Sequence, residues 1–213
     1  MAATGGKRGR PAPAREEGTR ARLLEAAVRT IEEAGADAVR VRDVAAAAGV
    51  TYASLYHFFG DREGLIAAAQ AERYERSMLW VTDAFTEGVR RCRDQQEFRT
   101  FCRHTLNQVF DEGNARNRMT RINVLGACQN KPVLAARIAD AQARINATLA
   151  EIFRGPQLRG WIPAELDLIM LFGLYNGQLN GRVLIEVGPE RADGRAWDRI
   201  AARGVLAALF GEE

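Results

Sequence analysis

Two short helical patterns separated by one glycine, at residues 42–59, constrain the fold of this chain more than any other feature. The apolar residues that recur at helical spacing are Val44, Ala45 and Ala48 before the glycine and Val50, Leu55 and Phe59 after it. Gly49 can adopt the positive φ that a tight turn between two helices requires. This layout predicts a helix-turn-helix of the kind that reads DNA, although a purely structural pair of helices would show the same apolar spacing.

The second helix of this pair carries polar, small and aromatic residues on the side that faces away from its apolar positions. These residues are Tyr52, Ala53, Ser54, Tyr56 and His57. Major-groove readout needs a short helix whose exposed N-terminal residues reach base edges while neighbouring groups hold phosphates. Ala53 can offer a methyl contact to thymine, and Tyr52 an aromatic edge or a hydroxyl. We therefore predict that this face contacts DNA; the alternative for Tyr56 is that its ring packs on the first helix.

The segments on either side extend the pattern. Thr19–Ala27 reads as an amphipathic first helix, and Phe59–Ile66 as the acidic and basic start of a fourth helix. With the Ala-rich second helix, Ala-Gly-Val-Thr at 48–51 and Leu-Tyr-x-x-Phe at 55–59, this order of features makes residues 19–68 resemble the tetracycline-repressor (TetR) family of transcriptional regulators. The remainder is similar to the family only in length and helical character. The resemblance implies an all-α fold, with a three-helix helix-turn-helix domain followed by a larger helical domain for ligand binding and dimerisation.

The resemblance also implies roles for single residues. By this resemblance, Tyr52 and Ala53 are expected to contact bases. The DNA backbone is expected to be contacted by Ser54, Tyr56 and His57. Arg42 matches a DNA-facing position and can donate a bidentate pair to guanine or a phosphate. Arg62 stands where the family commonly has a lysine, an exchange that preserves a phosphate contact. The predicted DNA-binding residues are therefore Arg42, Thr51, Tyr52, Ala53, Ser54, Tyr56, His57 and Arg62.

Arg40 departs from the family pattern. Relatives often have a capping threonine at this position, and an arginine side chain cannot accept a hydrogen bond from the free N–H groups of a helix start. The sequence therefore does not determine where the second helix starts, or whether that start contacts the DNA backbone.

The chain of 213 residues and 23.5 kDa is long enough for two helical domains, each with its own core. We predict a disordered basic arm at residues 1–18, a helix-turn-helix domain at 19–66 and a ligand-binding and dimerisation domain at 67–213. The cations of the arm suit a polyanionic partner, or they belong to a solvated tail. Arg-Gly-Arg-Pro at 8–11 is similar to the core of AT-hook peptides; non-specific attraction to phosphate is the alternative reading.

Periodicity and helix-breaking residues place about nine helices and no strand. We expect the first helix to have Thr19 as its N-cap and to end at Gly35, and the fourth to have Asp61 as its N-cap. The seventh is expected to end at Gly155-Pro156. The eighth is expected to run from Pro163 to about Val187 and the ninth from about Asp193 to Phe210, with Gly188-Pro189 as the break between them.

The last two helices carry small residues at regular spacing. These are Gly173, Gly177 and Gly181 on the eighth helix and Trp197, Ala201, Val205 and Ala208 on the ninth. Glycines at this spacing weaken a helix but let another backbone approach closely. We predict a four-helix interface between two copies of the chain, as the resemblance also implies. The alternative is that the glycines face a neighbouring helix of the same chain.

Regulators of the family that the chain resembles commonly hold a small molecule inside the larger domain. The bulky or polar residues able to line such a pocket are Phe85, Phe101, Met119, Asn123, Phe172, Tyr175 and Asn176. Ordinary core packing is the alternative for each of them. No cluster of charge points to a strongly ionic ligand, so a small, mostly apolar effector is expected.

Catalytic and metal-binding motifs are missing from the sequence. His57 and His104 are the only histidines, and no Ser-centred elbow, His-Glu-x-x-His or phosphate loop is present. Cys92, Cys102 and Cys128 form no Cys-x-x-Cys pair, so we expect reduced thiols, no metal and no cofactor. No signal peptide or membrane-spanning segment is recognisable, which predicts a cytoplasmic protein.

Two functions are consistent with these features. The first is a repressor whose homodimer binds a palindromic double-stranded DNA operator and is released by a small-molecule effector. The second is a ligand-independent DNA-binding or architectural protein of the same fold, in which the larger domain only dimerises or docks a protein partner.

Overall fold

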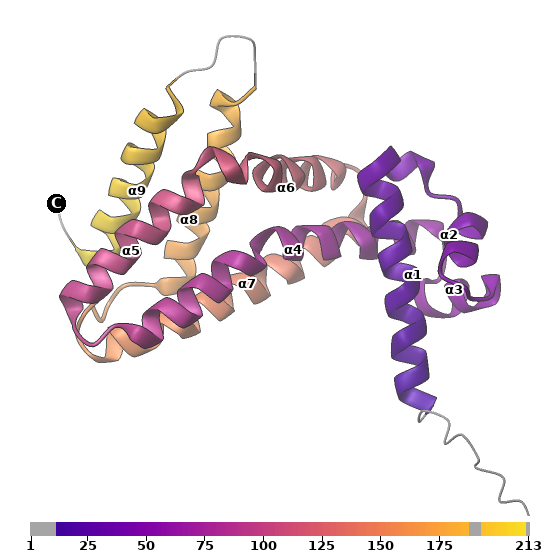
Figure 1. Cartoon of the computed structure of the whole chain (residues 1–213), viewed down its shortest axis with the longest axis horizontal. Helices are drawn as coiled ribbons and strands as arrows, with labels where there is room; N and C mark the ends of the chain where they lie inside the picture. The colour runs from indigo at the N-terminus through magenta and orange to yellow at the C-terminus, as the bar shows by residue number, and fades with distance from the viewer. Residues whose placement is uncertain (1–11, 188–192, 212–213) are drawn as a thin grey trace, which may run out of the picture. The chain divides into compact units, whose positions relative to one another are not determined.

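The computed structural model describes residues 12–187 and 193–211, and the regular elements in these ranges are all helical (Figure 1). The predicted all-α fold is confirmed. The α-helices are α1 (Ala12–Ala34), α2 (Val41–Ala47), α3 (Tyr52–Phe59), α4 (Arg62–Arg91), α5 (Gln95–Phe110), α6 (Ala115–Ala127), α7 (Pro132–Leu158), α8 (Leu168–Gly181) and α9 (Gly194–Phe210). Short 3₁₀ turns are η1 (Ala36–Ala38), η2 (Glu112–Asn114) and η3 (Arg182–Ile185). Within the described ranges, no helix combines the length and apolarity that crossing a bilayer requires.

The chain divides into two compact units, one ending at Glu72 and the other starting at Arg73, with α4 continuing from the first into the second. The first unit is a three-helix domain completed by the start of α4. Its buried core includes Leu24, Ala27, Val28, Ile31, Val44, Leu55, Phe59 and Leu65. The apolar face predicted for α1 and the inward positions predicted for α3 are among these residues, which confirms their periodicity.

Helix α1 begins earlier than predicted. It starts at Ala12, so residues 12–18, which we expected to be disordered, are helical. Thr19 is not an N-cap: its Oγ1 donates a hydrogen bond to the carbonyl oxygen of Arg15, at 2.9 Å. The packed turns that follow already supply the helix nucleus, so each preceding residue joins at little cost, and Ala, Arg and Glu are good helix formers. The Arg-Gly-Arg-Pro segment lies outside the described residues.

The connections between the first helices use the residues that the sequence indicated. Gly49, between α2 and α3, has φ +62°, and Gly35, after α1, has φ +82°. Side chains other than glycine rarely adopt such values, so both turns depend on glycine. Asp61 caps α4, because its Oδ1 accepts a hydrogen bond from the N–H of Gly64 at 2.7 Å. The predicted roles of Gly49 and Asp61 are confirmed.

The core of the second unit is centred on aromatic rings. Phe85, Phe98 and Phe172 each lie edge-on to Phe153, with ring centroids 5.1–5.6 Å apart. Edge-to-face packing of this kind contributes about 0.5–1.5 kcal/mol per pair beyond the area that it buries. Gly88 lets α5 approach α4, since a Cβ there would overlap the ring of Phe101.

Two helix limits in the second unit differ from the prediction. Helix α7 continues through Gly155-Pro156 to Leu158, because a proline in the last turn removes only one intrahelical N–H and its ring is buried here. The helix is terminated instead by Gly160, which has φ +73°.

Helix α8 begins at Leu168 rather than near Pro163. The carboxylate of Asp167 accepts hydrogen bonds from the N–H groups of Ile169 and Met170, at 2.9 and 3.1 Å, and this cap sets the start. The helix ends at Gly181 and continues as η3 to Ile185, while Gly188-Pro189 lies outside the described residues. Helix α9 follows its Asp193 N-cap, as predicted.

Candidate nucleic-acid interface and effector site

Helix α3 has a capped and accessible first turn. Thr51 Oγ1 accepts a hydrogen bond from the N–H of Ser54 at 3.3 Å, and the two hydroxyl oxygens lie 2.8 Å apart. The predicted DNA contacts Thr51, Tyr52 and Ala53 are exposed and Ser54 is half-buried. The opposite side of the helix is buried in the core, so α3 has one free face, as the sequence predicted.

Tyr52 and Tyr56 form a pair on the free face of α3. Their hydroxyl oxygens are 2.7 Å apart, their ring centroids 4.7 Å, and the residues are 48% and 40% exposed. The hydrogen bond with Tyr52 favours the protonated phenol of Tyr56 and raises its pKa above the ordinary value. Tyr56 therefore packs against Tyr52 on the accessible face. The hydrogen bond between them orients both hydroxyls, and Tyr52 is a predicted base-contacting residue.

The first turns of α1 and the free face of α3 enclose a shallow hollow. Its volume is about 370 Å³, and it is lined by Arg15, Glu16, Thr19, Thr51, Ala53, Ser54, His57 and Phe58. The hollow exists because α1 extends back to Ala12. Arg15 thereby becomes a cation next to the predicted DNA-contacting residues, a role that we did not assign to it from the sequence. Its position in the basic N-terminal run was the available signal.

The arginines of the α2 segment are placed differently from one another. Arg42 is exposed on the first turn of α2, as expected for a DNA-facing residue. Arg40 occupies the N-cap position of α2 and makes no side-chain cap; its Nη1 donates instead to the carbonyl oxygen of Asp37. Arg40 thus stabilises the preceding turn, and no side chain at the N-cap accepts a hydrogen bond from the first N–H groups of α2.

The side chain of Arg62 forms hydrogen bonds within the first unit, in contrast to its predicted phosphate contact. Its Nε donates to the carbonyl oxygen of Val39 at 2.9 Å, and its Nη2 to those of Ala36 and Asp37 at 3.2 and 3.3 Å. Its Nη1 pairs with Glu63 at 2.8 Å. Because all three nitrogens have internal acceptors, Arg62 ties the start of α4 to η1. The charge of Arg62 is evident from the sequence, but the carbonyl groups that accept its hydrogen bonds are not.

We expect Arg62→Ala to loosen η1 and to destabilise the first unit by about 1–3 kcal/mol, because several carbonyl groups lose a charged donor. Amide hydrogen exchange at Ala38 and Val39, whose N–H groups close this turn, should become faster. The salt dependence of DNA binding should be unchanged. A flatter salt slope with unaltered exchange would instead favour the phosphate contact.

Comparison with known proteins agrees with this geometry. Residues 23–69 match the family model described as "Bacterial regulatory proteins, tetR family". The HTH-type transcriptional regulator TtgR of Pseudomonas putida is 26% identical over 176 residues, covering 78% of this chain and 81% of TtgR. The helix-turn-helix domain of the chain is that of the TetR family of transcriptional regulators.

Solved structures of TetR-like proteins have the same fold. A structure from Mesorhizobium loti, assigned as a TetR-family transcriptional regulator, aligns with a TM-score of 0.64 at 18% identity, covering 91% of this chain and 96% of that one. Salmonella enterica GusR aligns with a TM-score of 0.60 at 21% identity, covering 96% and 99%. The likeness to these structures shows the fold, and the family match of residues 23–69 with the similarity to TtgR indicates a DNA-binding transcriptional regulator rather than an enzyme.

The residues predicted to line an effector pocket in the second unit fall into three groups. Phe85, Phe101, Phe172 and Tyr175 pack with other rings in the core. Met119 and Asn123, which we assigned to the pocket lining, are exposed on α6 and line neither the core nor the hollow described next. Asn176 lines a hollow, described next. The apolar spacing of α6 gave no sign of which side of this helix faces inward.

The hollow that contains Asn176 lies among α4, α6, α7 and α8. Its volume is about 440 Å³, and its lining is Tyr74, Leu125, Cys128, Ala135, Ile138, Ala139, Gln142, Asn146, Gly173, Asn176, Gly177 and Asn180. Tyr74 donates a hydrogen bond to Gln142, and both Gln142 and Asn176 donate to Asn146. The hollow therefore combines apolar and glycine surface with a connected row of amides.

The predicted dimer residues are divided between the surface and the interior of the chain. Gly173 and Gly177 are exposed, and a Cβ on either would meet no atom within 4 Å. Gly181 instead faces the ring of Trp197 of the same chain, because a Cβ added at Gly181 would lie only 3.2 Å from that ring. On α9, Ala201 and Val205 are buried and Trp197 and Ala208 half-buried. The predicted α9 stripe thus belongs to the chain's own core, which corrects the assignment.

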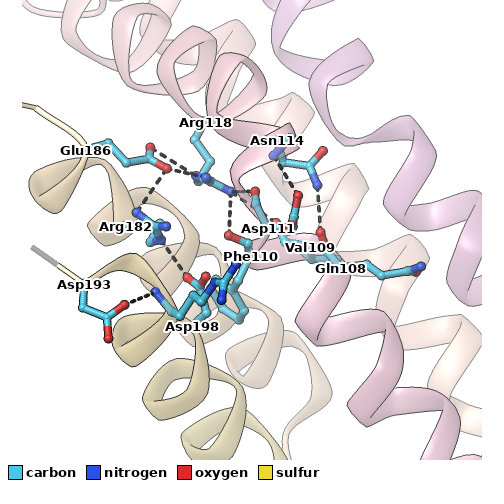
Figure 2. A network of polar contacts seen from close by, with 12 residues as sticks. Gln108, Val109, Phe110, Asp111, Asn114, Arg118, Arg182, Glu186, Asp193 and Asp198 are labelled. Atoms are coloured by element: carbon cyan, nitrogen blue, oxygen red, sulfur yellow. Dashed lines mark hydrogen bonds and ion pairs between the residues drawn. The ribbon is translucent and has the colours of Figure 1, made fainter. Parts of the chain in front are cut away.

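Four charged side chains that we did not single out form a buried network (Figure 2). Arg118 of α6 pairs with Glu186, Arg182 of η3 pairs with Glu186 at 3.2 Å, and Arg182 also pairs with Asp198 of α9 at 2.7 Å. Two positive and two negative charges balance within this network. It joins α6, η3 and α9 by groups whose pairing no sequence pattern indicated.

Proposed function

We propose that the protein is a homodimeric repressor that binds a palindromic operator and is released by a small molecule in the hollow of the second unit. The free face of α3 carries this proposal. It presents Tyr52, Ala53 and Tyr56 outward on a helix that is capped at Thr51 and buried on its other side. Such a helix can enter the major groove with its N-terminal residues at the base edges.

Exposed apolar residues on α8 and α9 support dimerisation. They are Met170 and Leu174 on α8, together with the exposed glycines Gly173 and Gly177, and Ile200 with Gly204 on α9. Apolar surface of this extent on two adjacent helices is typical of a protein interface. One helix-turn-helix per chain and a two-fold interface together give a palindromic site whose half-sites lie about one helical turn, or a little more, apart.

Selection of bound sequences from random duplex DNA tests this function. We expect wild-type protein to select a palindrome, and Tyr52→Ala to relax the base preference at one or two positions of each half-site, by about 1–3 kcal/mol per position. Arg15→Ala should weaken binding to all sequences alike and reduce the salt slope by about one. Arg90→Ala, an exposed arginine of the second unit, is the control. Selection of the same palindrome with undiminished affinity by Tyr52→Ala would contradict the assigned reading face.

A further inference from the structure

One buried cation in the second unit has no charged partner. Arg121 of α6 is 3% exposed, and its Nη1 donates to Met78 Sδ at 2.8 Å. Its Nε is buried without a hydrogen-bond partner. Among the residues that the structure describes, no carboxylate forms an ion pair with it, whereas its neighbour Arg118, one turn earlier on α6, is paired with Glu186.

An unpaired buried charge is costly. Burial lowers the pKa of Arg121, but a guanidinium stays protonated in proteins, so the positive charge remains. A thioether is a weak acceptor and supplies no negative charge. Buried charges in proteins are normally paired and hydrogen-bonded, because the loss of hydration is otherwise uncompensated. The surroundings of Arg121 therefore favour an anion that the described chain does not supply.

The groups next to Arg121 are suited to bind the same anion. Tyr175 is fully buried, and its hydroxyl has no hydrogen-bond partner. Tyr74 lies one turn before Met78, the α4 residue that the guanidinium contacts, and the charge of Arg121 acts to lower the pKa of both the Tyr74 and the Tyr175 phenols. Burial keeps the pKa of both phenols raised, so each is a neutral O–H. A guanidinium with one phenol free to donate offers the donor set that a carboxylate accepts.

Arg121 is close in sequence to two α6 residues that line the hollow. Leu125 and Cys128, which line it, follow Arg121 at the i+4 and i+7 positions and therefore share its face of α6. Leu125 is 37% exposed and Arg121 3%, so this face leads inward from the surface. Tyr74 lines the hollow and lies one turn before Met78, which accepts the hydrogen bond of Arg121. A ligand lying in the hollow can thus direct one end toward the guanidinium.

We propose that the effector is an organic monocarboxylate, with its apolar body in the hollow and its carboxylate on Arg121 and the Tyr175 hydroxyl. This inference rests on the effector role proposed above and names the ligand class. A single negative charge matches the charge of Arg121, since the Arg118 network is already neutral. A phosphate monoester, with a charge of about −1.5 to −2, would leave negative charge buried without compensation. The apolar effector expected from the sequence is thereby given a charged head group.

Binding of three probes with the same alkyl chain tests the proposal: octanoate, octanamide and octylamine, which is cationic at neutral pH. Calorimetry and thermal shift on the full-length protein should detect octanoate, with octanamide weaker by roughly 10- to 100-fold and octylamine without effect. Arg121→Met should weaken octanoate by a similar factor and leave octanamide unchanged. Arg121→Lys, which retains the charge but loses the bidentate geometry, should fall between them.

The apo protein supplies a second readout that does not depend on the size of the probe. Arg121→Met removes a buried charge that has only a weak hydrogen bond to Met78, and Tyr175→Phe removes a hydroxyl without a partner, so neither should lower the melting temperature. A marked loss of stability in both variants would overturn the proposal, as would equal binding of octanoate and octanamide, or no binding of octanoate to wild type. Octanoate that binds through Arg121 without releasing the operator would instead contradict the effector role and leave the carboxylate site standing.

Discussion

Replacement of Arg118 by Met should lower the free energy of unfolding of the second unit by about 3–5 kcal/mol, the range seen when one partner of a buried ion pair is removed. Arg118 is fully buried, and its Nη1 lies 3.0–3.3 Å from the carbonyl oxygens of Val109, Phe110 and Asp111 at the end of α5. Its other nitrogens bind Glu186 (Figure 2). Without it, three carbonyl groups lose a charged donor and Glu186 retains only Arg182.

Urea unfolding followed by tryptophan fluorescence measures this change. Trp80, Trp161 and Trp197 are the three tryptophans, and all belong to the second unit, so the signal is specific to it. Arg121→Met is a matched control, because it makes the same chemical change three residues further along α6. We expect a large loss at position 118 and none at position 121. Similar losses at both positions would show that burial alone, and not pairing, determines the contribution of these arginines.

The contrast between these two arginines shows where sequence reasoning stops. Helical spacing and a glycine at the turn were sufficient to predict α2, α3 and their exposed face, because local periodicity reports directly which side of a short helix is buried. Nothing local distinguishes Arg118, Arg121 and Arg182 from solvated arginines. Their roles depend on residues as far as 68 positions away, as Glu186 is from Arg118.

Helix limits and interface residues were missed for related reasons. An apolar stripe indicates burial but not whether the same chain or a second copy provides it, so the α9 stripe from Trp197 to Ala208 was assigned to a dimer although the chain's own core covers much of it. Arg62 was read by its charge, while its acceptors are backbone carbonyl groups that have no signature in the sequence. Pro156 was read as a helix end, although the last turn of a helix tolerates a proline whose ring is buried.

A charge placed on the exposed face of α8 should separate the proposed dimer and greatly weaken DNA binding. Leu174 is 49% exposed and lies one turn after Met170 on this face. In a two-fold interface, Leu174→Arg would bring the introduced charges of both copies into apolar surface. We expect a monomer by light scattering and an operator affinity lower by roughly 10²–10⁴-fold, the gain that linking two binding modules provides.

Leu158→Arg is the control for this experiment, because Leu158 is an 83% exposed leucine at the end of α7, outside the proposed interface. Gly177→Leu is a poorer test, since Gly177 also lines the effector hollow and its side chain would change two sites at once. The Leu174 variant should bind an isolated half-site as well as wild type does, because α3 and its cap are unchanged. A Leu174→Arg protein that stays dimeric would place the interface elsewhere, and a monomer with full operator affinity would show that two-fold pairing is not needed to read the site.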